Sequence, residues 1–342
     1  MQIKTCLKYE YKKGMLLHGG LWVILLCLAV NFLILFLSRP QLWEYTFDKA
    51  VYKEYIAKYG GVYSDETAEA MRVESAELLI AASSTEDAQA QSAEEYIMLA
   101  DERLIAQHRL EALSAALMRY EELAEIPGAA LIYDLELAEY LQSNTALLFA
   151  IACMAFFTVT VYFSDLSCGM HRLLYTAKAG RKHILQSKRI CILITAAVLF
   201  AFFAVTGFFA AGIHRDFGDL RAPLNSVRGF AACRLQISVR GGLWLALLLK
   251  TLSGLLAASL LLLCCALLKN EIASLSAFGL MFAAGYYLAE NSLLNPVTYL
   301  RGTAALSAMS PGKLGAAVTG TVLLSAVMLC AVRLLEARRD TP

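Results

Sequence analysis

The stretch of sequence that decides the fold is MLLHGGLWVILLCLAVNFLILFLS, residues 15–38, which contains no Asp, Glu, Lys or Arg. Five further windows have the same apolar character: 146–163, 190–213, 241–268, 272–289 and 314–332. Each of the six windows holds at least 18 residues, and a helix of that length crosses a hydrocarbon core of about 30 Å. Lys250 is the only charged residue within them. The sequence therefore predicts an all-α membrane protein with six transmembrane helices.

The composition of the whole chain agrees with this prediction. Of its 342 residues, 58% are hydrophobic and 17% are charged, whereas soluble domains average about 45–50% apolar and about 25% charged residues. The composition excludes a soluble globular protein, a single-span receptor and a secreted disulfide scaffold. No small-x-small cleavage site follows the first window, so we interpret that window as a retained membrane anchor.

Charge is segregated along the chain. Residues 41–144 hold 21 acidic and 7 basic side chains, a net charge of −14, while the remainder of the chain carries +15. Such segregation is expected when the acidic and basic parts face opposite sides of a membrane. None of the nine cysteines lies in the acidic stretch, so this stretch must fold without disulfides.

The distribution of basic residues predicts which side each segment faces. Six spans place both termini on the same side, with the segments 1–14, 164–189, 269–271 and 333–342. These segments hold 14 basic residues in 53 positions, against 15 in 158 positions for 39–145, 214–240 and 290–313. The positive-inside rule therefore predicts cytoplasmic termini and an acidic extracytoplasmic domain between the first two transmembrane helices. The five arginines of 214–240 are unusual for an outer loop.

The acidic domain at 39–145 has helical periodicity. The run Ala93–Glu125 predicts a long amphipathic helix, and Glu66–Ala82 predicts a second one that Ser64 would cap. We expect the two helices to pair as an antiparallel hairpin, and Pro127–Gly128 to break the chain after it. The segment 1–14 fits either a helix on the inner leaflet, with its lysines facing anionic lipid, or an ordinary basic flank.

The loop 164–189 carries the most informative pattern of polar, glycine and leucine residues. Asp165 is predicted to end the second span and to open a short helix, which Gly180 would stop before a basic turn. The pattern is formed by Asp165, Gly169, Leu173, Leu174, Thr176, Gly180, Arg181 and Lys188. An apolar ridge with a basic rim can dock a soluble partner. The alternative is a basic turn that only fixes the topology.

The spacing of these residues resembles the loop between the second and third spans of ABC-2 type transporter permeases. The resemblance extends to six spans, a large outer domain with a Tyr-rich start (Tyr45, Tyr52, Tyr55 and Tyr59) and an amphipathic N-terminus. It implies a multi-pass protein of a bacterial cell membrane whose loop 164–189 couples to a cytosolic ATPase subunit. The family commonly has Glu where this chain has Asp165, and often Pro before the Arg, where this chain has Ala179-Gly180.

Several residues within or beside the spans are candidates for a translocation path: Asn31, Lys250 and Glu290. A charge within a span is costly and often functional, so Lys250 could meet an anionic head group; it could equally reach the outer interface or pair with Glu290. Asn31 could instead donate a hydrogen bond between helices. The segment 290–313 is apolar enough to re-enter the outer leaflet.

The resemblance implies that the chain is the permease subunit of an ABC transporter, and we expect that transporter to be an exporter. The chain contains no G-x-x-x-x-G-K-[ST] motif, so we expect no ATPase activity and no cofactor in it, with ATP and Mg bound by the partner subunit. A second permease subunit and membrane lipid are the other expected partners, and nucleic acid is not. The alternative is a membrane-anchored sensor or scaffold whose acidic outer domain binds a ligand without transport.

Overall fold

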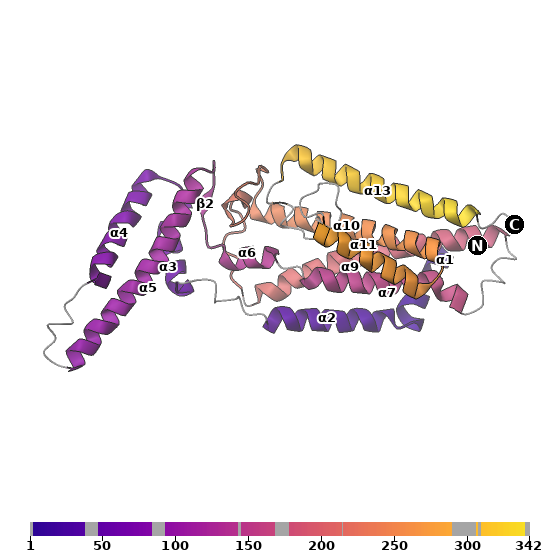
Figure 1. Ribbon diagram of the computed structural model, residues 1–342, viewed down its shortest axis with the longest axis horizontal. Helices are drawn as coiled ribbons and strands as arrows, with labels where there is room; N and C mark the ends of the chain where they lie inside the picture. The colour runs from indigo at the N-terminus through magenta and orange to yellow at the C-terminus, as the bar shows by residue number, and fades with distance from the viewer. Residues whose placement is uncertain are drawn as a thin grey trace. The chain divides into compact units, whose positions relative to one another are not determined.

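The computed structural model describes residues 3–37, 47–83, 93–142, 145–167, 178–213, 215–288, 306 and 309–338. The chain is mainly helical and divides into two compact units (Figure 1). The first unit comprises Met1–Ser38, Tyr140–His214 and Leu243–Pro342. The second unit comprises Arg39–Glu139 and Arg215–Gly242.

Five helical segments in the described part of the chain are long and apolar enough to cross a membrane. They are Gly20–Leu37, Leu135–Asp165, His183–Gly212, Val239–Leu268 and Pro311–Ala337. The sixth predicted window, 272–289, forms helix α11 (Glu271–Leu288), of which Glu271–Gly285 is a shorter apolar helix. This pattern agrees with a multi-pass, all-α membrane protein.

The core of the first unit lies among helices drawn from distant parts of the chain. Helix α2 (Gly20–Leu37) packs against α7 (Thr145–Ser167) and α9 (Lys178–Gly212), and α7 packs along α9. Helix α10 (Val239–Leu268) joins the same apolar core. Its Gly254 lies so close to α9 that a Cβ atom there would overlap the ring of Phe200. Close backbone approach through small residues is the usual means of packing helices in a membrane.

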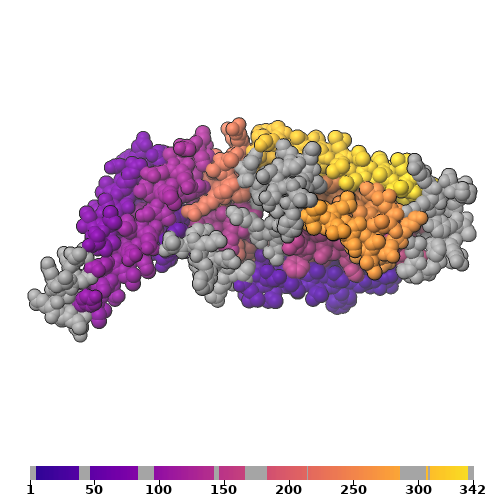
Figure 2. Space-filling view, viewed as in Figure 1, coloured from indigo at the N-terminus to yellow at the C-terminus, as the bar shows by residue number. Residues whose placement is uncertain are grey.

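Two helices of the first unit leave most of their apolar surface uncovered. Helices α2 and α13 (Pro311–Arg338) are each only 17% buried over their most apolar window, and both lie at the surface in Figure 2. Leu26 is 65% exposed on α2, and Leu323 is 65% exposed on α13. Apolar surface of this extent fits contact with lipid or with another membrane-embedded chain.

The second unit is built on the predicted helical hairpin. Helices α4 (Asp65–Ser83) and α5 (Ala93–Ala124) pack side by side (Figure 1), which confirms both helices and their pairing. Ser64 Oγ accepts a hydrogen bond from Thr67 N at 3.2 Å, so the predicted N-cap is also confirmed. Arg72 of α4 forms an ion pair with Glu121 of α5 at 2.7 Å.

Helix α3 (Lys49–Tyr59) supplies aromatic side chains to the core of this unit. Tyr52 is fully buried, and Met71, Leu113 and Tyr120 are at most 1% exposed. After the chain breaks at Pro127–Gly128, strand β2 (Ala130–Leu131) pairs antiparallel with β1 (Gly61–Val62). This short pairing is an addition to the predicted all-α fold.

The arginine-rich segment 215–242 belongs to the same unit as the hairpin. It contains a single 3-10 turn, η4 (Leu224–Ser226), and an isolated bridge between Pro223 and Ser238. Ala130 N donates to Ser226 Oγ at 2.9 Å, which ties the segment to strand β2. Sequence reasoning treated 39–145 and 214–240 as separate segments, whereas most of their residues fold together.

Candidate functional site

The candidate site lies where the N-terminal segment meets the ends of α7 and α9. Asp165 lies in the last turn of α7, which continues to Ser167. The prediction that Asp165 opens a new helix is therefore wrong. A carboxylate in the last turn of a helix meets the partial negative charge of the final carbonyl groups, so Asp165 needs cationic partners in order to be stable there.

Two lysines supply that positive charge. Lys13 Nζ lies 2.5 Å from Asp165 Oδ1, and Lys188 Nζ lies 2.6 Å from Asp165 Oδ2. The side chains of Lys13, Asp165 and Lys188 are 6%, 15% and 3% exposed. Lys188 Nζ also donates to the carbonyl oxygen of Tyr162 at 3.2 Å. Each carboxylate oxygen thus has its own buried ammonium group, which links α7 to both the N-terminal segment and α9.

Lys13 reaches Asp165 through an irregular turn of the N-terminal segment. Helix α1 (Ile3–Lys12) is followed by a π-helical turn, η1 (Lys13–Leu17), and π turns are frequent at functional sites. A Cβ atom on Gly14 would lie 2.7 Å from side-chain atoms of both Phe157 and Val161. Only glycine therefore allows this close approach to α7.

The predicted helix at the N-terminus forms, but its charges do not all face outward. Cys6 of α1 is 3% exposed, and α1 packs against α9. Of the two alternatives for 1–14, the one in which the lysines face lipid does not hold for Lys13, because its ammonium group is buried against Asp165.

Glu10 adds a second carboxyl group to this cluster. The residue is 4% exposed, and its Oε2 has no hydrogen-bond partner among the residues that the structure describes. Burial raises the pKa of Glu10, the charge of Lys188 lowers it, and the charge of Asp165 raises it. We refer to Glu10, Lys13, Asp165 and Lys188 as the inner ion cluster.

A second ion pair lies beside this cluster. Arg189 Nε lies 3.7 Å from Glu336 Oε2, and the two side chains are 12% and 7% exposed. Glu336 belongs to α13. The end of α9 that holds the inner ion cluster is thereby also tied to the last helix.

The remaining predicted coupling residues divide into two groups. Gly169, Leu173, Leu174 and Thr176 lie outside the described residues. Gly180 and Arg181 lie in the first turns of α9, which begins at Lys178 and continues without a break. The prediction that Gly180 stops a helix is therefore wrong. Gly180 lies in the first turn of α9, because the helix that forms the predicted third span begins before this glycine, at Lys178.

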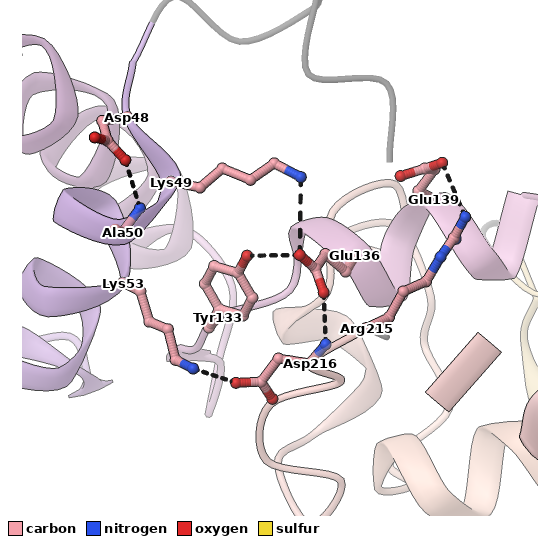
Figure 3. Close-up of polar contacts among 9 residues, drawn as sticks. All are labelled: Asp48, Lys49, Ala50, Lys53, Tyr133, Glu136, Glu139, Arg215 and Asp216. Carbon is pink, nitrogen blue, oxygen red and sulfur yellow. Dashed lines mark hydrogen bonds and ion pairs between the residues drawn. The ribbon is translucent and has the colours of Figure 1, made fainter. Parts of the chain in front are cut away.

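A polar junction in the second unit explains part of the unusual arginine content of 214–240 (Figure 3). Arg215 Nη2 lies 3.3 Å from Glu139 Oε1. Asp216 N donates to Glu136 Oε2 at 2.5 Å, and the Asp216 carboxylate pairs with Lys53 of α3 at 2.5 Å. The hydrogen bond from Lys53 and another from the backbone N–H of Gly218 lower the pKa of Asp216.

A more deeply buried junction holds the other end of this segment. Arg228 N donates to Asp134 Oδ2 at 2.6 Å, and Arg228 Nη2 donates to the hydroxyl of Tyr52 at 3.2 Å. Asp134 is 1% exposed, and this burial raises its pKa. Arg119 Nη2 donates to the carbonyl oxygen of Ser226 at 2.9 Å. Arginines of the segment and carboxylates of the helical domain thus hold the second unit together.

The predicted path residues lie apart from the inner ion cluster in sequence. Asn31 is 2% exposed on α2, and within the described part of the chain its Oδ1 has no hydrogen-bond partner. Lys250 of α10 lines a small cavity, with about 20 Å³ of room for water, together with side chains of α2, α7 and α9. Glu290 lies outside the described residues, as does most of the segment 290–313, so their predicted roles stay predictions.

Sequence reasoning found two members of the inner ion cluster and missed the other two. The spacing pattern of the loop contains Asp165 and Lys188, whereas Lys13 and Glu10 lie in a segment whose sequence fits either a membrane-surface helix or an ordinary basic flank. An isolated acidic residue within the basic sequence KYEYKK was the available signal. In the described part of the chain, no group of three or more His, Cys, Asp or Glu side chains could hold a metal ion.

Comparison with known proteins adds no family to these observations. No family model, curated protein or solved structure matches the chain.

Proposed function

We propose that this chain is the permease subunit of an ABC transporter, that the transporter works as an exporter, and that a separate cytosolic ATPase drives it. The observation that supports the proposal most directly is the pairing of Asp165 with Lys13 and Lys188. These three residues join the helix before the loop, the helix after it and the N-terminal segment.

The inner ion cluster would connect the loop 164–189 firmly to α7, α9 and the N-terminal segment. A partner that pulls on 164–189 acts on both ends of the loop, at α7 and α9. Breaking a buried ion pair by removing one partner costs about 3–5 kcal/mol, so the three elements would move together and not separately. Rigid-body movement of this kind is one of the recognised modes of switching between two states.

The partners in this proposal follow from what the chain lacks and from what it exposes. The chain has no phosphate-binding loop motif, so ATP and Mg would bind to the cytosolic partner. The uncovered apolar faces of α2 and α13 would contact lipid or a second permease subunit, identical or similar. The termini and the inner ion cluster would lie on the cytoplasmic side of a bacterial cell membrane, and the second unit on the outer side.

Purification of the tagged full chain from native membranes, after mild cross-linking, tests the proposal. We expect mass spectrometry to find an ABC ATPase, and we expect Leu173→Asp to remove it. The control is Leu79→Asp, which makes the same exchange at a 56% exposed position of α4 in the second unit and should leave the ATPase bound.

The outcome that contradicts the proposal is equally definite. Capture of a histidine kinase or a protease, with no ABC ATPase in either sample, would favour the sensor or scaffold. If the Leu173→Asp variant retained the ATPase, the result would show that the loop 164–189 does not bind it.

A further inference from the structure

Helix α1 has two opposite faces with different surroundings. One face carries Cys6 and Glu10, which are 3% and 4% exposed, and the helix packs against α9. The other face carries Lys8 and Lys12, and both lysines are exposed. Because these lysines lie four positions apart in a helix, they are neighbours on its surface. The helix is therefore anchored by one face and presents a pair of cations on the other.

The two exposed lysines have no anionic partner in the part of the chain that the structure describes. No described carboxylate lies within ion-pair distance of Lys8 or Lys12, whereas Lys13 of the same segment pairs with Asp165. Like charges four positions apart destabilise a helix by their repulsion. An anion that contacts both ammonium groups would relieve this repulsion, so the pair is suited to binding a phosphate group.

Two tyrosines flank the lysine pair. Tyr9 and Tyr11 are 52% and 51% exposed. At 3.6 residues per turn, one tyrosine lies on each side of the pair. Tyrosine is enriched where a membrane protein meets the head groups of a bilayer, because its ring is apolar and its hydroxyl is polar. Exposed lysine and tyrosine side chains together are therefore typical of a surface that contacts lipid head groups.

Apolar side chains follow the lysine pair as the chain enters the first membrane helix. Leu16 and Leu17 of η1 are 59% and 69% exposed, and Trp22 near the start of α2 is 75% exposed. A phospholipid has the same order of properties, a charged phosphate followed by apolar acyl chains. An acidic soluble protein would complement the lysines but not the apolar residues after them. This order favours a lipid as the occupant of the surface.

We propose that Lys8 and Lys12 bind the head group of an anionic phospholipid, whose acyl chains lie beside η1 and the start of α2. The structure separates this exposed pair from Lys13, which is buried against Asp165. A lipid bound there would help to hold α1 in place, and the opposite face of α1 contributes Glu10 to the inner ion cluster. The proposal requires neither an ATPase nor transport, so it stands or falls separately from the proposed function.

The test uses the purified full chain in phosphatidylcholine nanodiscs, without any ATPase. Two probes are compared, phosphatidylglycerol and phosphatidylcholine, each with the same photoreactive diazirine in an acyl chain. We expect cross-links in peptides from α1 and η1 to be about tenfold stronger with the anionic probe. Unlabelled phosphatidylglycerol should displace that probe. Displacement by inorganic phosphate instead would assign the lysines to a soluble anion and overturn the proposal.

Substitution of the lysines tests the recognition itself. Lys8→Gln/Lys12→Gln should reduce labelling by phosphatidylglycerol to the level of phosphatidylcholine, whereas Lys8→Arg/Lys12→Arg should retain it. The matched control Arg221→Gln/Lys313→Gln removes two exposed cations from other parts of the chain and should keep the wild-type preference. Equal labelling of the wild type by the two lipids would overturn the proposal, as would an unchanged preference in the glutamine variant.

Cross-linking in native membranes decides between lipid and protein as the occupant, and it leaves both lysines in place. Tyr9→p-benzoylphenylalanine should give adducts of phospholipid mass when the intact chain is analysed by mass spectrometry. Adducts with a protein in place of lipid would overturn the proposal. A chain that prefers phosphatidylglycerol but recruits no ATPase would contradict the proposed function and leave this site intact. A chain that recruits the ATPase without this preference would do the reverse.

Discussion

Asp165 of α7 connects three elements, because it pairs with Lys13 of η1 and with Lys188 of α9. Its carboxylate lies at the unfavourable end of α7, where the helix dipole repels negative charge. It persists there because Lys13 and Lys188 each occupy one of its oxygens, and all three side chains are at most 15% exposed. Buried ion pairs contribute little net stability when intact but cost much when one partner is lost.

Removing the carboxylate should therefore destabilise the protein strongly. Asp165→Asn leaves two buried ammonium groups without their shared partner, and we expect a loss of about 3–5 kcal/mol in the free energy of unfolding. The unfolding temperature of the purified chain in detergent measures this loss. Asp101→Asn, at an exposed position of α5, should stay within about 0.5 kcal/mol of wild type. Equal unfolding temperatures for the two variants would show that Asp165 is dispensable.

Glu10 should have the opposite effect when its charge is removed. Its pKa is raised in the folded chain, so folding favours the protonated form. That contribution to stability is complete below the unfolded pKa of about 4.3 and is lost as the pH rises through the folded pKa. At about pH 7, Glu10→Gln should therefore be more stable than wild type by about 1 kcal/mol.

The pH dependence of unfolding tests this sign. The advantage of Glu10→Gln should shrink as the pH falls and should be lost below about 4.3, where the wild-type carboxyl becomes protonated in both states. Glu54→Gln, at an exposed position of α3, should show no such trend. A lower unfolding temperature for Glu10→Gln at neutral pH would mean that Lys188 depends on the charge of Glu10.

At the scale of helices, the contact between η1 and α7 depends on a missing side chain. A Cβ atom on Gly14 would lie 2.7 Å from atoms of Phe157 and Val161, whereas one on Gly279 of α11 would meet nothing within 4 Å. We expect Gly14→Ala to cost about 1–3 kcal/mol through overpacking and Gly279→Ala to be nearly neutral. Unfolding temperatures of the two variants provide the measurement, and equal values would contradict the close packing.

The same scale shows what sequence reasoning can and cannot reach. Hydropathy and helical periodicity are local properties, so the long apolar helices, the α4–α5 hairpin and the Ser64 cap were all predictable. The pairing of Lys13 with Asp165 joins residues 152 positions apart, and no local pattern encodes such a contact. The helix end predicted at Gly180 is also wrong. A glycine before a basic turn is a local signal for a helix end, but α9 begins at Lys178 and continues through Gly180.

At the scale of the whole molecule, the second unit constrains the topology of the first. Its two segments are connected to α2, α7, α9 and α10, which lie beside them in the sequence. Because one folded unit cannot straddle a bilayer, we expect both segments to lie on the same side of the membrane, which each of these four helices would cross once. Arg215 and Arg228 pair with carboxylates of their own unit, so these two arginines carry less weight as signals of a cytoplasmic loop.

Site-directed labelling of single introduced cysteines tests this topology. The positions are Glu54→Cys and Arg221→Cys, one in each segment of the second unit, and Lys12→Cys at the end of α1; all three are exposed. With a membrane-impermeant maleimide on intact cells, we expect labelling at 54 and 221 above the background of the native cysteines, and labelling at 12 only after permeabilisation. Reaction at only one of positions 54 and 221 would show that the two segments do not lie on the same side of the membrane. Reaction at 12 in intact cells would reverse the orientation, and the inner ion cluster would then lie on the side that no cytosolic ATPase can reach.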